Sequence, residues 1–243
     1  MRGEKKINIK NIINILFENF GGKFSDSLGI KLKEKNPDEI FKWFLASVLY
    51  GARIGEKIAT KTYYEFEKRD ILSPSEILDT GWDRLVEILD IGGYVRYDFK
   101  TATKLLNIMK IVQDNYNNNL DNLHESALNF QDLEKKLIEM PGIGPTTTNI
   151  FLRELRGIWK KADPNLSSFA EAAAYNLGLL NIVAKNSKQK RENLNLLKEI
   201  WNKSKKKGYG FSDFEACLVR LGKNFCRKKS TQCSVRTFCK KPC

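Results

Sequence analysis

The sequence has few of the residues on which several common classes of functional site depend. It contains one histidine, His124, among 243 residues. This excludes His-rich zinc sites and argues against a catalytic dyad built on imidazole. Because the residues around it are polar, we expect His124 to lie in a solvated helix or loop without a catalytic role. The six prolines stand at expected helix starts, in turns or in the tail, where they leave helices uninterrupted.

Long apolar runs are also missing. The longest, residues 43–52, has about half of the roughly 18 residues that a membrane-spanning helix needs. The first residues are mostly charged, and no apolar signal-peptide segment follows them. We therefore expect a cytoplasmic protein that makes no contact with a membrane, and we expect it to be a monomer.

Alternation of apolar and polar residues, which marks β-strands, is almost absent. Apolar residues instead recur three and four positions apart along most of the chain, which predicts an all-α fold. Three helix starts carry capping signals: Asn36 before Pro37, Ser73 before Pro74, and Ser168 with Glu171. The expected helices cover residues 9–20, 37–50, 55–68, 82–91, 94–116, 131–140, 145–156, 168–179, 190–204 and 211–225, and a further helix is expected to start at Pro74.

Positive charge is in excess. The chain has 42 Lys and Arg against 29 Asp and Glu, a net charge of +13. Residues 201–243 alone hold twelve basic and two acidic residues, so this segment carries +10 (12 − 2). A basic segment of this kind favours a polyanionic partner, with nucleic acid ahead of an anionic membrane surface.

The most informative motif is Met-Pro-Gly-Ile-Gly-Pro-Thr-Thr at residues 140–147. Pro141 ends one helix and Pro145 suits the first position of the next, so the motif predicts two helices joined by a tight turn. Such a turn exposes backbone N–H groups at a helix N-terminus, where they bind phosphate. The candidates for contact with a nucleic-acid backbone are Gly142, Ile143, Gly144, Thr146 and Thr147.

With these residues in place, the segment 137–179 resembles the endonuclease III-like helix-hairpin-helix DNA glycosylases, the HhH-GPD superfamily. A weaker resemblance covers the chain from about residue 9 to its end. It implies a two-lobed, all-α glycosylase fold with the helix-hairpin-helix at 131–156 and a C-terminal cysteine cluster. One domain would span 36–159, and the other would combine 1–35 with 160–243, including the cysteine-rich tail 226–243.

The resemblance also implies an activity. Such proteins excise a damaged or mismatched base from double-stranded DNA in base-excision repair, which implies a nucleoid-associated protein. Asp163, in Ala162-Asp163-Pro164, stands at the distance from the hairpin where the family has its essential aspartate. A carboxylate there stabilises the positive charge that develops on the sugar as the N-glycosidic bond breaks. Asp163 is therefore the expected catalytic residue.

One departure from the family concerns the associated lyase reaction. Bifunctional members carry a lysine two residues after the second hairpin glycine, and this chain has Thr146 there. The resemblance therefore implies a monofunctional glycosylase. Two alternatives stay open: a glycosylase with AP-lyase activity that uses another amine, such as Lys160 or Lys161, or a non-catalytic DNA-binding protein on the same scaffold.

The resemblance also suggests residues for intercalation into DNA or for the pocket of the flipped base. The connection after the second expected helix holds Arg53, where the family inserts a side chain into the duplex. Aromatic residues near it and in a second turn would line the pocket. The candidates are Arg53, Tyr50, Tyr94, Arg96 and Tyr97, with Trp43 as a further aromatic residue.

A second departure concerns the cysteines. The tail reads Cys226-x6-Cys233-x5-Cys239-x3-Cys243, whereas many family members have C-x6-C-x2-C-x5-C around a [4Fe–4S] cluster. The resemblance implies such a cluster here, with zinc or no metal as alternatives. The fifth cysteine, Cys217, lies on an apolar helix face, and we expect it to be buried without a ligand role.

Overall fold

The structure, a computed structural model, describes residues 8–240. These residues form helices and turns and contain no strand, which confirms the all-α prediction. The chain divides into two compact units. We call residues 28–164 the central unit, and residues up to 27 with those from 165 on the terminal unit. The domain borders at 36 and 159 stay a prediction, because compactness alone does not show which segments fold independently.

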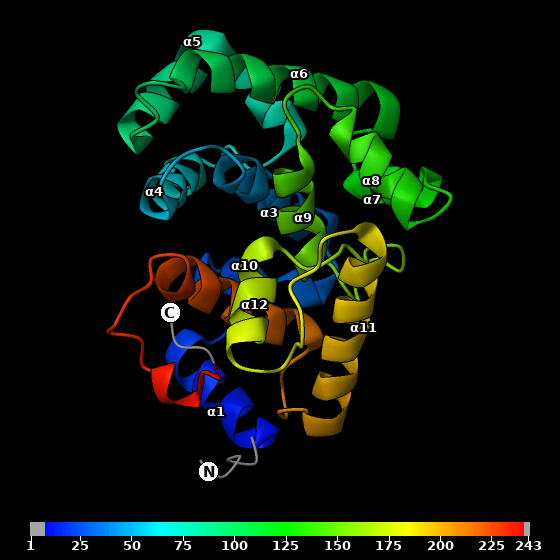
Figure 1. Cartoon of the computed structure of the whole chain (residues 1–243). Coiled ribbons are helices and arrows are strands. Elements are labelled where there is room, and N and C mark those ends of the chain that lie inside the picture. The colour runs from blue at the N-terminus through cyan, green and yellow to red at the C-terminus, as the bar shows by residue number, and fades with distance from the viewer. Residues whose placement is uncertain (1–7, 241–243) are drawn as a thin grey trace, which may run out of the picture. The chain divides into compact units, whose positions relative to one another are not determined.

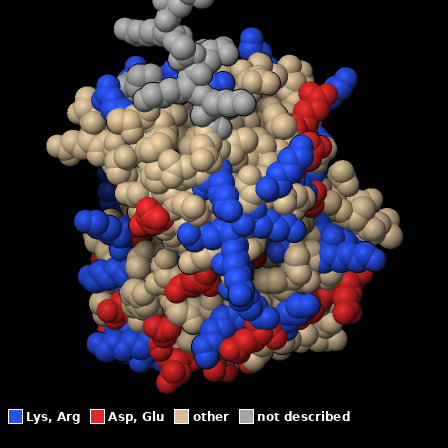
Figure 2. All heavy atoms as spheres, turned by 90° about the horizontal axis from the view of Figure 1, so that it is seen from below, with Lys and Arg blue, Asp and Glu red and all other residues tan. Residues whose placement is uncertain are grey.

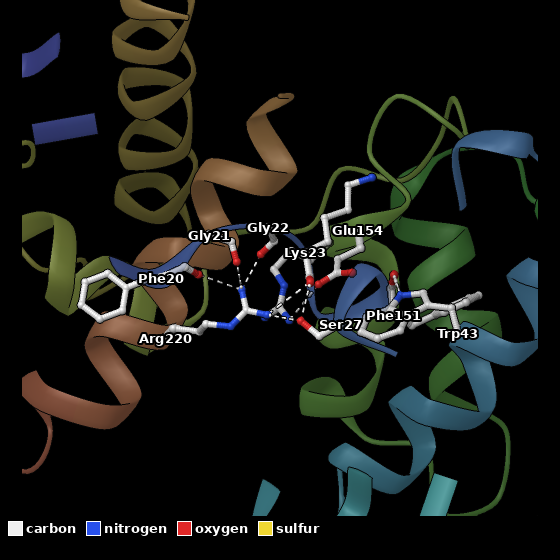
Figure 3. Close-up of polar contacts among 10 residues, drawn as sticks. Phe20, Gly21, Gly22, Lys23, Ser27, Trp43, Phe151, Glu154 and Arg220 are labelled. Carbon is white, nitrogen blue, oxygen red and sulfur yellow. Dashed lines mark hydrogen bonds and ion pairs between the residues drawn. The ribbon is translucent and has the colours of Figure 1, made fainter. Parts of the chain in front are cut away.

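The central unit is built around one buried helix, α3. Nine of its side chains are buried, and Trp43, Phe44 and Leu45 have no exposed surface. The indole Nε1 of Trp43 donates to the carbonyl of Phe151 at 3.1 Å, which ties α3 to α9 (Figure 3). The elements of this unit are η1 (Leu32–Glu34), α3 (Pro37–Tyr50), α4 (Glu56–Glu67), α5 (Pro74–Gly92), α6 (Asp98–Tyr116), α7 (Leu120–Ser126), α8 (Phe130–Ile138) and α9 (Pro145–Glu154) (Figure 1).

Two of the predicted caps in this unit are confirmed. The side chain of Asn36 accepts the N–H of Asp38 at 2.9 Å. The hydroxyl of Ser73 accepts the N–H of Glu76 at 3.2 Å. These bonds satisfy donors that a helix N-terminus leaves without a partner, which is why such residues mark helix starts.

The separation expected between the helix that starts at Pro74 and the helix at 82–91 is present as a kink in α5 at Gly81, whose φ of 72° is not helical. Two other predictions in the central unit are wrong. Helix α6 begins at Asp98 rather than at 94, because the intervening residues form a turn that buries Tyr94. Helix α7 was not expected, although Asn119 caps it by accepting the N–H of Asp121 at 2.8 Å.

The terminal unit packs α1 and α11 against α12, which is buried along most of its length. Aromatic rings fill the contact: the Phe17 ring lies 5.9 Å from that of Trp201, which stacks on Phe214 at 5.5 Å. The elements of this unit are α1 (Ile9–Phe20), α2 (Phe24–Ser27), α10 (Ser168–Asn176), α11 (Ser187–Ser204), α12 (Phe211–Leu221), η2 (Gly222–Cys226) and η3 (Arg236–Phe238).

Arg220 of α12 closes the turn between α1 and α2 (Figure 3). Its guanidinium lies 4.0 Å above the ring of Phe24 and donates to the hydroxyl of Ser27 at 3.0 Å. It also donates to the backbone carbonyls of residues 20–23. The half-buried guanidinium thus satisfies the carbonyls that the end of α1 leaves without partners.

Three helix ends in the terminal unit also differ from the predictions. The cap of α10 is Ser167, whose hydroxyl accepts the N–H of Ala170 at 3.3 Å, and not Ser168. Glu171 is not part of a capping box, because its carboxylate accepts from the side chain of Asn193 at 2.5 Å. Helix α11 begins at Ser187, and α12 ends at Leu221 in a wider π turn.

In the part of the chain that the structure describes, every helix is too short or too polar to cross a membrane.

Candidate functional site

The hairpin between α8 and α9 has the predicted form. Gly142 adopts φ +73°, a left-handed conformation that favours glycine. The side chains of Met140 and Ile143, 2% and 4% exposed, anchor the turn in the core. The N–H of Ile143 donates to the carbonyl of Met140 at 3.0 Å. This N–H therefore closes the turn, so among the predicted contact residues it is the neighbours of Ile143 that have N–H groups open to a ligand.

The start of α9 offers donors to an anion. Gly144 is the N-cap and has no side-chain hydrogen bond to the helix, and Pro145 holds the first helical position. The N–H groups of a first helical turn have no carbonyl partner within the helix, and they lie at the positive end of its dipole. Thr146 is exposed at this end. The geometry suits a phosphate group.

Thr147 contributes differently from Thr146. Its side chain is 3% exposed and packs on Gly51, at the end of α3. A Cβ added at Gly51 would lie 1.9 Å from the Thr147 hydroxyl oxygen. Only the backbone of Thr147 is thus placed for a ligand, whereas its side chain fixes the hairpin to α3.

The end of α3 also gathers the residues predicted for intercalation or for the base pocket. The hydroxyl of Tyr94 donates to the carbonyl of Leu49 at 2.7 Å, which places the α5–α6 turn beside this end. Arg53 is exposed in the α3–α4 connection, and Arg96 and Tyr97 are exposed in the α5–α6 turn. These segments therefore meet where Thr147 packs on α3.

The two other predicted aromatic residues are less accessible. Tyr94 is 1% exposed, and burial raises the pKa of its hydroxyl. Tyr50 is half-buried, its hydroxyl lies 2.7 Å from that of Thr60, and burial raises its pKa to about 12. Trp43 has no exposed surface. Sequence reasoning missed the exposed apolar residues Val95 and Phe99 beside Arg96, 65% and 60% exposed, which break the apolar periodicity.

Asp163 is held at the other end of α9. The guanidinium of Arg156 forms an ion pair with it, with 2.7 Å between Nη1 and Oδ1. Nη2 donates to the carbonyl of Pro164 at 2.6 Å. The side chain of Arg156 is 6% exposed and that of Asp163 is 36% exposed. The arginine thus fixes the loop by a charge-assisted contact, while part of Asp163 faces solvent.

The loop that carries Asp163 rests on α7. The indole Nε1 of Trp159 donates to Asp121 at 2.6 Å, and its ring stacks on His124 at 4.9 Å. The N–H of Lys161 donates to Nε2 of His124 at 3.3 Å. The expectation of a solvated His124 is therefore wrong, because the ring is half-buried in this packing. Burial, and then the charge of Lys161, lowers its pKa.

The two lysines considered as alternative amines differ. The ammonium of Lys161 donates to the carbonyls of His124 and Glu125, at 2.8 and 3.1 Å. Lys160 is exposed on the same loop. Through these contacts Lys161 ties the loop to the end of α7.

Three of the tail cysteines come together. Cys226, Cys233 and Cys239 line one small cavity. Cys243 lies outside the described residues. Among residues 8–240, no three Cys, His, Asp or Glu side chains lie close enough to share a metal ion. The donor type thus suits iron or zinc, but the described thiols do not form a ligand set. As expected, Cys217 is buried, and burial raises its pKa to about 12.

Basic side chains are abundant on the surface. Figure 2 shows Lys and Arg gathered across one face of the molecule, with Asp and Glu interspersed. In the tail, Arg227, Lys228 and Lys229 are exposed. A surface of this charge attracts a polyanion.

Known structures show the same architecture. The chain matches no family model and no curated protein. It is similar to H. pylori 3-methyladenine DNA glycosylase bound to 1,N6-ethenoadenine, with 14% identity over 91% of this chain and 98% of that one (TM-score 0.56). It is also similar to endonuclease III in a non-covalent complex with DNA, with 18% sequence identity over 96% of this chain and 94% of that one (TM-score 0.55). A thermostable thymine-DNA glycosylase has 13% sequence identity to the chain, over 96% of this chain and 95% of that one (TM-score 0.57). The chain has the fold of the endonuclease III-like helix-hairpin-helix DNA glycosylases.

Proposed function

We propose that this protein is a DNA glycosylase of base-excision repair, acting on a damaged or mismatched base in double-stranded DNA. The observation that carries the proposal is the Asp163 carboxylate, partly exposed and held by Arg156 at the end of α9. The start of the same helix is the hairpin with its open N–H donors. One helix thus joins a candidate phosphate site to a candidate catalytic acid.

In the proposed reaction the target base leaves the stack, because its glycosidic bond cannot be reached inside the duplex. The C1′–N bond then breaks, and positive charge develops on the deoxyribose. The ionised Asp163 stabilises this charge and orients the water that adds to C1′. The products are the free base and an abasic site. Arg156 acts as a positioning residue, since its guanidinium holds the carboxylate and the next carbonyl of the loop.

We further propose that the enzyme is monofunctional. A lyase reaction begins with an imine between an amine and the opened sugar, and the hydroxyl of Thr146 cannot form one. Lys161 is engaged with two backbone carbonyls. Borohydride should therefore trap no covalent complex between the protein and its abasic product.

The sharpest test is single-turnover base release by Asp163→Asn. The panel of duplexes would contain uracil or thymine opposite guanine, alkylated purines and oxidised guanine. Loss of the charge should slow release by at least about 10²-fold, while DNA binding is retained. The control is Asp79→Asn, which changes the charge equally at an exposed position of α5. Base release by Asp163→Asn at the wild-type rate would refute the assignment. Wild-type protein that binds DNA and releases no base would support the non-catalytic alternative.

For the tail, we propose that Cys226, Cys233, Cys239 and Cys243 hold a [4Fe–4S] cluster, whose binding would draw the three described thiols closer together than they lie in this structure. Such a cluster would stabilise the tail, and no step of base release passes through it. Purified protein should contain iron and sulfide and absorb near about 400 nm. Cys233→Ser should lose this absorbance and Cys217→Ala should keep it. Zinc in place of iron would leave a structural role for the thiolates, and protein without either metal would reject the proposal.

A further inference from the structure

Lys104 of α6 lies against the hairpin turn. A Cβ added at Gly142 would lie 3.2, 2.9 and 3.2 Å from its Cγ, Cδ and Cε atoms. The aliphatic stem therefore runs along the face of Gly142 that lacks a side chain. The ammonium stands one bond beyond Cε, so it too is beside the turn. Gly142 therefore has two roles: it adopts the left-handed backbone conformation of the turn, and its lack of a side chain leaves room for the stem of Lys104.

Lys104 is half-buried. Among residues 8–240 its ammonium forms no hydrogen bond and no ion pair. Burial alone lowers its pKa to about 8, since no neighbouring charge contributes. The other charged or titratable residues on the elements around it are Asp98, Lys100, Lys110 and Asp114 of α6, Glu76, Asp79, Asp83, Arg84, Glu87 and Asp90 of α5, Asp121, His124 and Glu125 of α7, Asp132, Glu134, Lys135, Lys136 and Glu139 of α8 and its C-terminal end, and Arg153 and Glu154 of α9.

An ammonium in this position is costly for the free protein. It loses hydration and gains no counter-charge, whereas a methionine of similar length would fill the same space without that penalty. Ionisable groups held in unfavourable surroundings are concentrated at functional sites. The adjacent turn presents N–H donors, which attract the same class of ligand as a cation does.

We propose that Lys104 is a ligand for a DNA backbone phosphate bound at the hairpin, where it adds a full positive charge to the N–H donors of the turn. The inference rests on the DNA-binding part of the proposed function and not on base release. Phosphate would supply the missing counter-charge, and the packing against Gly142 holds the stem in place before DNA arrives.

This role predicts a dependence of DNA affinity on pH. In free protein a group with a pKa of about 8 is protonated below that pH and becomes neutral above it. Phosphate binds the charged form, so affinity should fall as pH rises from about 7 to about 9.5. Ordinary exposed lysines remain charged over most of this range, because they titrate near about 10.4.

The test measures binding of an undamaged duplex to the full chain by fluorescence anisotropy. Lys104→Met should weaken binding about tenfold at pH 7 and reduce the salt slope by about one. Lys104→Arg should keep the affinity and lose the decline above pH 8, because arginine stays charged. The matched control is Lys110→Met, which removes an exposed lysine from the same helix. It should change affinity much less.

Thermal unfolding separates this role from a structural one. Lys104→Met should be at least as stable as wild type at pH 7, since it removes a buried, uncompensated charge. A structural lysine would instead give lower stability. Unchanged affinity and salt slope in Lys104→Met would overturn the proposal, as would lost stability. Because no base is released in this assay, the result holds whether or not the protein proves to be a glycosylase.

Discussion

At the scale of single residues, the position of Asp163 depends on Arg156, which precedes it by seven residues. The guanidinium holds both the carboxylate and the next carbonyl, so the side chain and the backbone of the loop are fixed together. The loop is further supported by Lys161, which donates to His124. A loop that must place a carboxylate against a reacting sugar benefits from such support, because small displacements reduce rates steeply.

His124 should make the stability of this loop depend on pH. Its pKa is lowered in the folded protein, so the unfolded chain binds the proton more tightly. Stability should therefore be highest above about pH 6.5 and should fall as the pH drops below that value. The cause is burial, and protonation also removes the acceptor for the N–H of Lys161.

The contribution of His124 to the pH dependence can be measured separately, because the chain has no second histidine. The measurement is thermal unfolding between about pH 5 and pH 7.5. His124→Phe keeps a ring beside Trp159 and removes the titrating group, so its stability should vary less over this range. An equal pH dependence in wild type and variant would contradict the assignment to His124.

At the scale of elements, α9 is the component that organises the candidate site. Its start forms the hairpin, its first turn packs on α3 through Thr147, and its last residue leads to Arg156. The end of α3 in turn lies beside the α5–α6 turn through Tyr94. A change at the contact of α3 with α9 should therefore affect both stability and DNA binding.

Gly51→Ala tests this contact. The new methyl group would lie 1.9 Å from the Thr147 hydroxyl oxygen and 2.9 Å from its Cβ, so the helices must separate. Overpacking of this kind costs about 1–3 kcal/mol, and DNA affinity should fall because the hairpin shifts. Gly55→Ala is the control, since it has φ −65° and no atom within 4 Å of the added Cβ.

A second substitution makes this test specific. Thr147→Ala in the Gly51→Ala background removes the clashing hydroxyl and should restore part of the stability. The measurements are chemical denaturation and duplex binding. Wild-type stability in the single variant Gly51→Ala would show that α3 and α9 do not pack closely at this point.

At the scale of the whole molecule, the net charge of +13 should dominate affinity for DNA. Binding to phosphates releases condensed counterions, so affinity should fall steeply between about 50 and 200 mM salt. Fluorescence anisotropy with an undamaged duplex measures this slope. Binding that is insensitive to salt would argue against phosphate contacts as the main source of affinity.

Several features of this protein follow from the sequence by itself. Pro141, Gly142 and Pro145 predict the hairpin, and Asn36 and Ser73 predict two helix starts. Each signal acts within about one helical turn, where backbone angles and capping bonds depend on the residues themselves. The absence of strand alternation likewise sets the fold class. Where such signals compete, as at Ser167 and Ser168, only the tertiary structure selects the cap.

The contacts that bring these elements together into a candidate site could not be predicted from the sequence, because they depend on the tertiary structure. Lys104 against Gly142 and Gly51 against Thr147 join segments far apart in the chain, and no periodicity relates them. Arg156 lies near Asp163 in sequence, yet only the path of the loop brings its guanidinium to the carboxylate. Side-chain burial and pairing depend on which helices pack together, and packing is a property of the folded chain as a whole.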